Sequence, residues 1–116
     1  MTEDKELLEL AAKAAEISIK WDENWNCFMR DARPVQEFDS EWLPWRPLTD
    51  DGDALRLAVK LRISFYRAES SDMLIECSYF DDETVSWIYI QEANDDPYLA
   101  TRRAIVRAAA EIGKAM

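Results

Sequence analysis

Histidine is absent from the 116-residue chain, and glycine and cysteine occur only twice each. Without histidine, the chain can build neither a Ser-His-Asp nor a Cys-His catalytic arrangement, and it lacks the commonest general base at neutral pH. The two glycines, Gly52 and Gly113, exclude the glycine-rich loops of P-loop and dinucleotide-binding proteins. Cys27 and Cys77 lie too far apart for the CxxC pairs of zinc and redox sites. We therefore expect no enzyme activity and no cofactor.

Long apolar segments and a signal peptide are also missing. No apolar run approaches the ~20 residues that cross a bilayer. The amino terminus, MTEDKELLEL, is acidic and has neither the basic nor the apolar region of a signal peptide. Two cysteines do not make a disulfide framework. These absences predict a cytoplasmic protein that does not bind membranes.

Charge of one sign dominates the chain. The 24 Asp and Glu side chains oppose 14 Lys and Arg, which gives a formal net charge of −10. A field of this sign repels nucleic acid, because nucleic-acid binding depends on neutralising phosphates. We therefore expect no direct nucleic-acid binding, and a protein with a basic surface is the natural electrostatic partner. The alternative is that the charge serves only solubility.

The spacing of apolar residues predicts one α+β domain over residues 1–116, because helical and strand-like periods alternate along the chain. The order α-β-β-(β)-α-β-β-β-α consists of helices at about 2–15, 49–61 and 97–116 and strands at about 17–21, 26–30, 41–45, 62–67, 73–80 and 85–91. Short polar connections, at 69–72 and 81–84, favour an antiparallel meander for the last three strands. Three helices packed with a mainly antiparallel sheet of about five or six strands is the simplest assembly.

The strand predicted at 85–91 is apolar on both faces. Val85, Trp87 and Tyr89 occupy one face, and Ile88 and Ile90 occupy the other. Because strands buried on both sides lose the polar face, this pattern favours a central strand. It also places Trp87 in the core.

Tryptophan is unusually frequent, with five in the chain. Trp21 alternates with polar residues in a strand and is expected in the core. Trp25 lies in a polar turn, and Trp42 and Trp45 lie in an irregular segment rich in proline and charge. These three are the better candidates for exposed anchors, because Trp buries much area for little lost rotamer freedom. The alternative is an aromatic lid over the core.

A carboxylate surface is the other candidate binding feature. Glu6, Glu9 and Glu16 lie on the polar face of the first predicted helix. Together with the acidic turns they can present negative charges at spacings comparable to those of phosphates on a duplex. The alternative is an ordinary solvated face. The acidic run at 50–53 lacks the spacing of a calcium loop and is better explained by helix capping, so we expect no metal site.

Two segments resemble a known family. The block PLTDDGDALRLAVKL at 47–61 and the ending DPYLATRRAIVRAAAEIG at 96–113 are similar to segments of small hypothetical proteins of tailed bacteriophages and prophages. With the LxxLAAKAA-like helix at 7–15, the arrangement resembles the phage ABA sandwich domain proteins. The resemblance implies a phage or prophage origin, hence the cytoplasm of a host bacterial cell, and an α/β/α-type packing. It implies no catalytic residues.

Origin and charge together lead to a functional hypothesis. It is a non-catalytic binding protein that inhibits a nucleic-acid-handling defence complex of the host, of the anti-CRISPR or anti-restriction type, with nucleic-acid mimicry as one mechanism. One alternative is a structural or self-assembling phage accessory protein that forms a homo-oligomer. A carboxylate-metal enzyme is the third alternative.

Overall fold

The structure is a computed structural model that describes residues 2–31, 41–68 and 74–116. Its elements are α1 (Thr2–Ala15), β1 (Ile19–Asp22), β2 (Cys27–Asp31), β3 (Trp42–Trp45), α2 (Asp51–Leu61), β4 (Ser64–Arg67), β5 (Leu74–Asp81), β6 (Ser86–Ala93) and α3 (Pro97–Lys114). The predicted α+β class and order of elements are confirmed. The connection expected at 69–72 lies outside the described residues. None of the helices in the described ranges is long and apolar enough to cross a membrane.

Capping residues set where α2 and α3 begin. The Asp50 carboxylate accepts a hydrogen bond from the Asp53 backbone N–H at 2.8 Å, which satisfies one of the free donors of the first turn of α2. The Asp96 carboxylate accepts from the Tyr98 and Leu99 backbone N–H groups in the same way, and Pro97 follows at the first helical position. Both helix starts agree with the sequence prediction.

The six described strands form two three-stranded antiparallel sheets, β1-β2-β3 and β4-β5-β6, where the sequence suggested a single sheet. β3 lies at the edge of the first sheet and pairs with β2, a position that suits Pro44 because proline cannot donate to a neighbouring strand. In the second sheet β5 is central and β6 pairs on one side only. The prediction of a central strand at 85–91 is therefore wrong.

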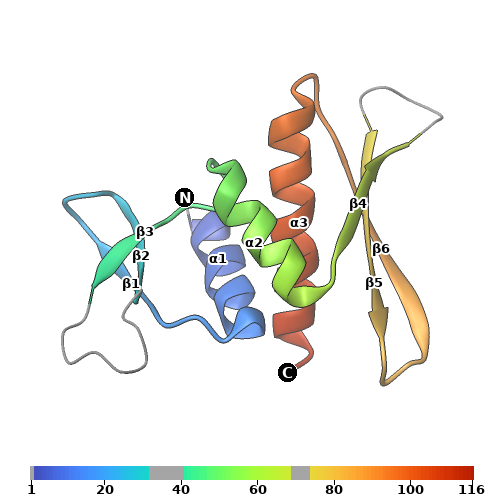
Figure 1. The fold of residues 1–116 in the computed structure, drawn as a ribbon, viewed down its shortest axis with the longest axis horizontal. Helices are drawn as coiled ribbons and strands as arrows, with labels where there is room; N and C mark the ends of the chain where they lie inside the picture. Colours follow the sequence, from blue (N-terminus) through green and yellow to red (C-terminus); the bar gives the residue numbers. More distant parts are fainter. Residues whose placement is uncertain (1, 32–40, 69–73) are drawn as a thin grey trace.

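The helices lie between the two sheets (Figure 1). α3 packs against α1 and α2 on one side and against β5 and β6 on the other. The buried cluster runs through these contacts, with Ala11 of α1, Leu57 of α2, Ile105 of α3 and Ile75 of β5 all at most 2% exposed. This arrangement differs from the α/β/α packing that the family resemblance implies, because here sheets flank a helical layer.

Small side chains let α1 and α3 approach closely. Ala11 and Ala15 of α1 and Ala104 and Ala108 of α3 are fully buried. At Gly113, an added Cβ would lie 2.1 Å from the backbone oxygen of Leu10. Glycine is required there by the close approach of α1, since no other residue fits without separating the helices.

α1 and α2 end in the same way and each leads into a three-stranded sheet, a repeat that the sequence did not reveal. Glu16 and Arg62, which follow the two helices, both have φ of 57°. The next residue then donates back to the helix: Ile17 to the Ala12 oxygen and Ile63 to the Ala58 oxygen, both at 2.9 Å. These are left-handed helix ends of the Schellman type, built here without glycine.

Candidate protein-binding site

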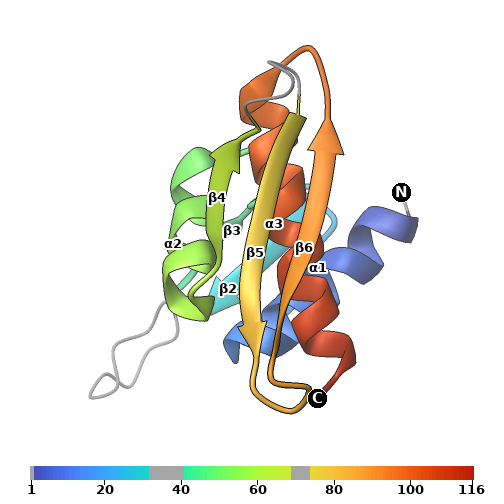
Figure 2. The ribbon, with the colours of Figure 1, turned by 90° about the vertical axis from the view of Figure 1, so that its right-hand side faces the viewer.

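The second sheet has one covered face and one open face. On β5, Ile75 and Cys77 are at most 2% exposed and belong to the core cluster that includes α3. Because side chains alternate along a strand, the residues between them point to the other side of the sheet. Figure 2 looks onto the second sheet from that side, and no helix lies in front of it. We call this side the outer face.

Four aromatic side chains project from the outer face. They are Tyr66 on β4, Phe80 on β5, and Trp87 and Tyr89 on β6, which are 46%, 44%, 54% and 57% exposed. Phe80 and Trp87 pair directly across the two strands, with ring centroids 5.5 Å apart in an edge-to-face arrangement. The sequence prediction that Trp87 lies in the core is wrong, because nothing in the described chain covers this side of β6.

The strand register arranges the outer face in rows. Phe80 and Trp87 form one row, Ser64, Ser78 and Tyr89 the next, and Tyr66, Glu76 and Gln91 the third. Ser78 is only 7% exposed although it points to this side. Its small side chain is therefore covered by larger neighbours on this face.

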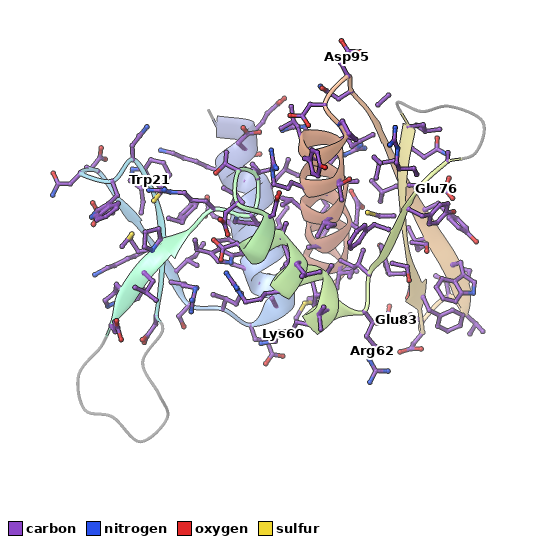
Figure 3. The ribbon with its side chains drawn as sticks, turned by 45° about the horizontal axis from the view of Figure 1, so that its top comes forward. Trp21, Lys60, Arg62, Glu76, Glu83 and Asp95 are labelled. Atoms are coloured by element: carbon purple, nitrogen blue, oxygen red, sulfur yellow. The ribbon has the colours of Figure 1, made fainter. Side chains whose placement is uncertain are left out.

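Glu76 places a carboxylate on the second sheet (Figure 3), in the row between Tyr66 and Gln91. The Tyr66 hydroxyl donates to one carboxylate oxygen, and Gln91 Nε2 donates to the other at 2.6 Å. These two hydrogen bonds, of which the one from Tyr66 has the larger effect, hold the pKa of Glu76 below its ordinary value. The hydrogen bond to Glu76 also raises the pKa of the Tyr66 hydroxyl. Glu76 is therefore ionised and fixed in direction at neutral pH.

The described residues of the outer face add no positive charge beside this carboxylate. None of the described positions on the outer face is Lys or Arg; they are Ser64, Tyr66, Leu74, Glu76, Ser78, Phe80, Trp87, Tyr89, Gln91 and Ala93. The β5–β6 turn at one end adds the exposed carboxylates of Asp82 and Glu83. The outer face is thus aromatic and negatively charged.

The tryptophans chosen from the sequence lie on or near the first sheet. Trp25, in the β1–β2 turn, is exposed at 56%, which agrees with the prediction. Trp42 is half-buried, with Lys20 Nζ 4.3 Å from its ring centroid. The expectation of exposure is wrong for Trp45, which is 3% exposed because it packs in the core cluster.

Trp25 and Trp45, together with Trp21, line a hollow between α1 and the first sheet. It has a volume of about 440 Å³, and Lys5 and Arg46 line it as well. Lys5 Nζ lies 3.7 Å from the Trp21 ring centroid, and the Arg46 guanidinium carbon lies 5.9 Å from that of Trp25. The chain's own cations therefore already occupy faces of two rings, which makes this a weaker docking surface than the outer face.

The predicted carboxylates also lie away from the outer face. Glu6 and Glu9 are exposed on α1. Glu16, which follows α1 with a left-handed backbone conformation, is exposed as well. α1 and the second sheet lie on opposite sides of α3 (Figure 1). A single flat partner surface therefore cannot cover both the acidic helix and the outer face.

The sequence does not mark Tyr66, Glu76, Phe80 and Tyr89 as site residues. The one available signal is the row of large aromatics on one side of 85–91, and a buried strand gives the same pattern. Trp and Tyr carry a polar group at the end of an apolar ring, so they suit an exposed binding face as well as a core.

No cluster of three or more Cys, Asp or Glu side chains that could hold a metal ion occurs within residues 2–31, 41–68 and 74–116. Burial raises the pKa of the Cys77 thiol to about 12, so this group is a neutral thiol at physiological pH. Comparison with protein-family models, with curated proteins and with solved structures finds no match for this chain.

Proposed function

We propose that the chain is a binding protein that docks a basic partner protein on the outer face of its second sheet and does no catalysis of its own. The observation that carries the proposal is the set of four exposed aromatics, Tyr66, Phe80, Trp87 and Tyr89, on a face that no described element covers. Clustered exposed apolar side chains mark interaction sites, and Trp and Tyr are the residues most enriched in binding hot spots.

The negative charge of the chain indicates the kind of surface that its partner presents. The chain carries a net charge of −10, and the outer face adds Glu76 and the acidic β5–β6 turn to its aromatic rings. Opposite potentials across an interface speed association and reject partners of like charge. A surface rich in Lys and Arg therefore fits this face, and nucleic acid does not.

The narrower proposal is that this partner is a nucleic-acid-handling complex of a bacterial host, and that binding inhibits it. Such complexes present basic grooves, because they must neutralise phosphates. An acidic protein that occupies the groove competes with the nucleic acid. The net charge and the resemblance of 47–61 and 96–113 to phage proteins support this proposal.

A pull-down from bacterial lysate with the tagged protein tests both levels of the proposal. The decisive comparison is between wild type, the double variant Trp87→Ser/Tyr89→Ser, and Trp25→Ser, which changes a tryptophan of similar exposure on the first sheet. We expect wild type and Trp25→Ser to retain one basic complex that high salt releases, and the double variant to lose it. Mass spectrometry identifies the complex.

Charge reversal on α1 tests whether the acidic helix, rather than the outer face, binds the partner. If Glu6→Lys/Glu9→Lys/Glu16→Lys abolishes capture while Trp87→Ser/Tyr89→Ser leaves it intact, the interface is the acidic helix and the outer face is wrong. A captured complex that does not handle nucleic acid contradicts only the narrower proposal.

Self-association is the second candidate, because a second copy would also cover the exposed aromatics. It would, however, bring two Glu76 carboxylates and two acidic turns together across the interface, which costs free energy at low ionic strength. Sedimentation velocity separates the two cases. A dimer that high salt strengthens and Trp87→Ser disrupts would favour self-assembly, whereas a monomer at all salt concentrations favours a separate partner.

A further inference from the structure

The carboxylate of Glu76 has a definite geometry that specifies more than a basic partner. An ionised carboxylate offers about four lone-pair positions. The Tyr66 hydroxyl and the Gln91 amide use one position on each oxygen. Among the described residues, each oxygen therefore keeps a lone-pair position for a donor from a partner, and the two hydrogen bonds hold the group in place before that partner arrives.

We propose that Glu76 receives the guanidinium of an arginine side chain from the partner, with the flanking aromatic rings stacked against it. This inference rests on the proposed function and specifies how the outer face recognises its partner. Arginine has a planar fork that donates two parallel hydrogen bonds to a carboxylate and a flat surface that stacks on aromatic rings.

The strand register places two tyrosines next to Glu76 on the outer face. Tyr66 lies directly across from Glu76, and Tyr89 lies one row away across Ser78. A cation within about 6 Å of an aromatic centroid is attracted to the ring face. Ser64 and Ser78, which share the row of Tyr89, carry only small side chains beside the carboxylate.

Other occupants fit this site less well. A nucleic-acid base could stack on the rings, but its phosphates would meet Glu76 and the acidic β5–β6 turn. An uncharged apolar segment would bury the Glu76 carboxylate without a cationic partner, which is costly. A lysine ammonium satisfies the charge but offers neither the fork nor the flat stacking surface.

Peptide binding followed by NMR tests this inference directly. The probes are an extended nonapeptide that alternates Arg with Thr, the same peptide with citrulline in place of Arg, and the same peptide with Lys. Citrulline keeps the shape of arginine and removes its charge. The reporters are the Trp87 indole N–H and the Gln91 side-chain amide. We expect the Arg peptide to shift both signals and to bind at least about tenfold more tightly than either other peptide.

Two matched variants separate the local carboxylate from the overall charge. Glu76→Gln removes one negative charge from the outer face, and Glu9→Gln removes one from the exposed side of α1. We expect Glu76→Gln to weaken binding of the Arg peptide about tenfold and Glu9→Gln to change it less than twofold. Tyr66→Phe, which keeps the ring and loses the hydroxyl, should weaken binding by an intermediate factor because Glu76 loses a restraint. Dispersed indole signals confirm that each variant is folded.

The outcomes distinguish this inference from the proposed function. If Glu76→Gln binds the Arg peptide as tightly as wild type, or if the citrulline or Lys peptide binds equally well, the arginine receptor is wrong. The docking face still stands in that case if Trp87→Ser/Tyr89→Ser loses the partner from lysate. If the double variant keeps the partner, the proposed function fails and this inference fails with it.

Discussion

Replacing Gly113 with alanine should destabilise the protein, against the usual effect of this substitution in a helix. Gly113 lies near the end of α3 and is buried against α1. An alanine Cβ would stand 2.1 Å from the Leu10 backbone oxygen, where ordinary contact needs at least 3.4 Å, so the two helices must separate by about 1.3 Å (3.4 − 2.1). The obstructing atom belongs to the backbone of α1 and cannot rotate away.

Two opposing terms set the magnitude. Glycine to alanine in a helix interior gains about 0.5–1 kcal/mol, and less near a helix end. Overpacking costs about 1–3 kcal/mol and rises when backbone must move. Separating α1 from α3 also loosens the contacts of Ala11, Ala15, Ala104 and Ala108, which are fully buried. We expect a net loss of about 1–2 kcal/mol in the free energy of unfolding, because the obstructing atom is backbone and the overpacking cost lies toward its upper end.

Urea denaturation of Gly113→Ala beside Gly52→Ala measures this effect. At Gly52 the added Cβ would lie 3.2–3.3 Å from the Arg56 guanidinium and 3.3 Å from the Asp50 carboxylate oxygen that caps α2, so these side-chain ends need to shift only by a few tenths of an ångström. Gly52→Ala should therefore change the unfolding free energy by less than about 1 kcal/mol. An unchanged or higher stability for Gly113→Ala would refute the close packing of α1 on α3.

Three further predictions concern single positions. Iodoacetamide at pH 8 should label Cys27 and spare Cys77, because burial raises the pKa of the Cys77 thiol to about 12. Peptide mass spectrometry after a short reaction measures the labelling of each cysteine, and equal labelling contradicts the prediction. Val85→Asn should raise the free energy of unfolding by about 1 kcal/mol. Val85 is 74% exposed and has a φ of 54°, a backbone conformation that asparagine adopts more readily than valine. A lower stability of the variant in urea would show that the turn needs valine. Asp96→Ala should lower the unfolding free energy by about 1 kcal/mol through loss of the α3 cap, whereas Asp95→Ala, its neighbour, should have little effect.

Local signals in the sequence predict the helices of this fold well. Asp50 and Asp96 act as caps through contacts with residues two or three positions away, and Pro97 fixes the first turn of α3. Interactions of this range are visible in the sequence without knowledge of the tertiary structure. The strands at 26–30, 41–45 and 62–67 were placed within a few residues for a similar reason, because proline and polar turns bound them.

The division into two sheets was not predictable from such signals. Whether β6 pairs on one side or two depends on contacts with distant segments, which periodicity does not report. Trp87 and Tyr89 therefore gave the same pattern that a covered strand gives. Trp25 and Trp45 show the same limit, because both lie in polar or irregular sequence, yet one is exposed and the other fills the core.

The candidate site depends on the same distant contacts. Glu76 acquires its partners across the sheet, from Tyr66 on β4 and Gln91 on β6. The sequence separates these three residues by 10 and 15 positions, so no local motif marks them. Only the register of the sheet brings the carboxylate into the middle of the aromatic face.

Footprinting of the protein in complex with its captured partner tests the docking face most directly. Hydroxyl radicals oxidise exposed aromatic side chains, so Trp87, Tyr89 and Trp25 all react in the free protein, where each is more than half exposed. If the partner docks on the outer face, it protects Trp87 and Tyr89 and leaves Trp25 as reactive as before. Protection of Trp25 with Trp87 and Tyr89 unchanged would place the interface on the first sheet and contradict docking on the outer face.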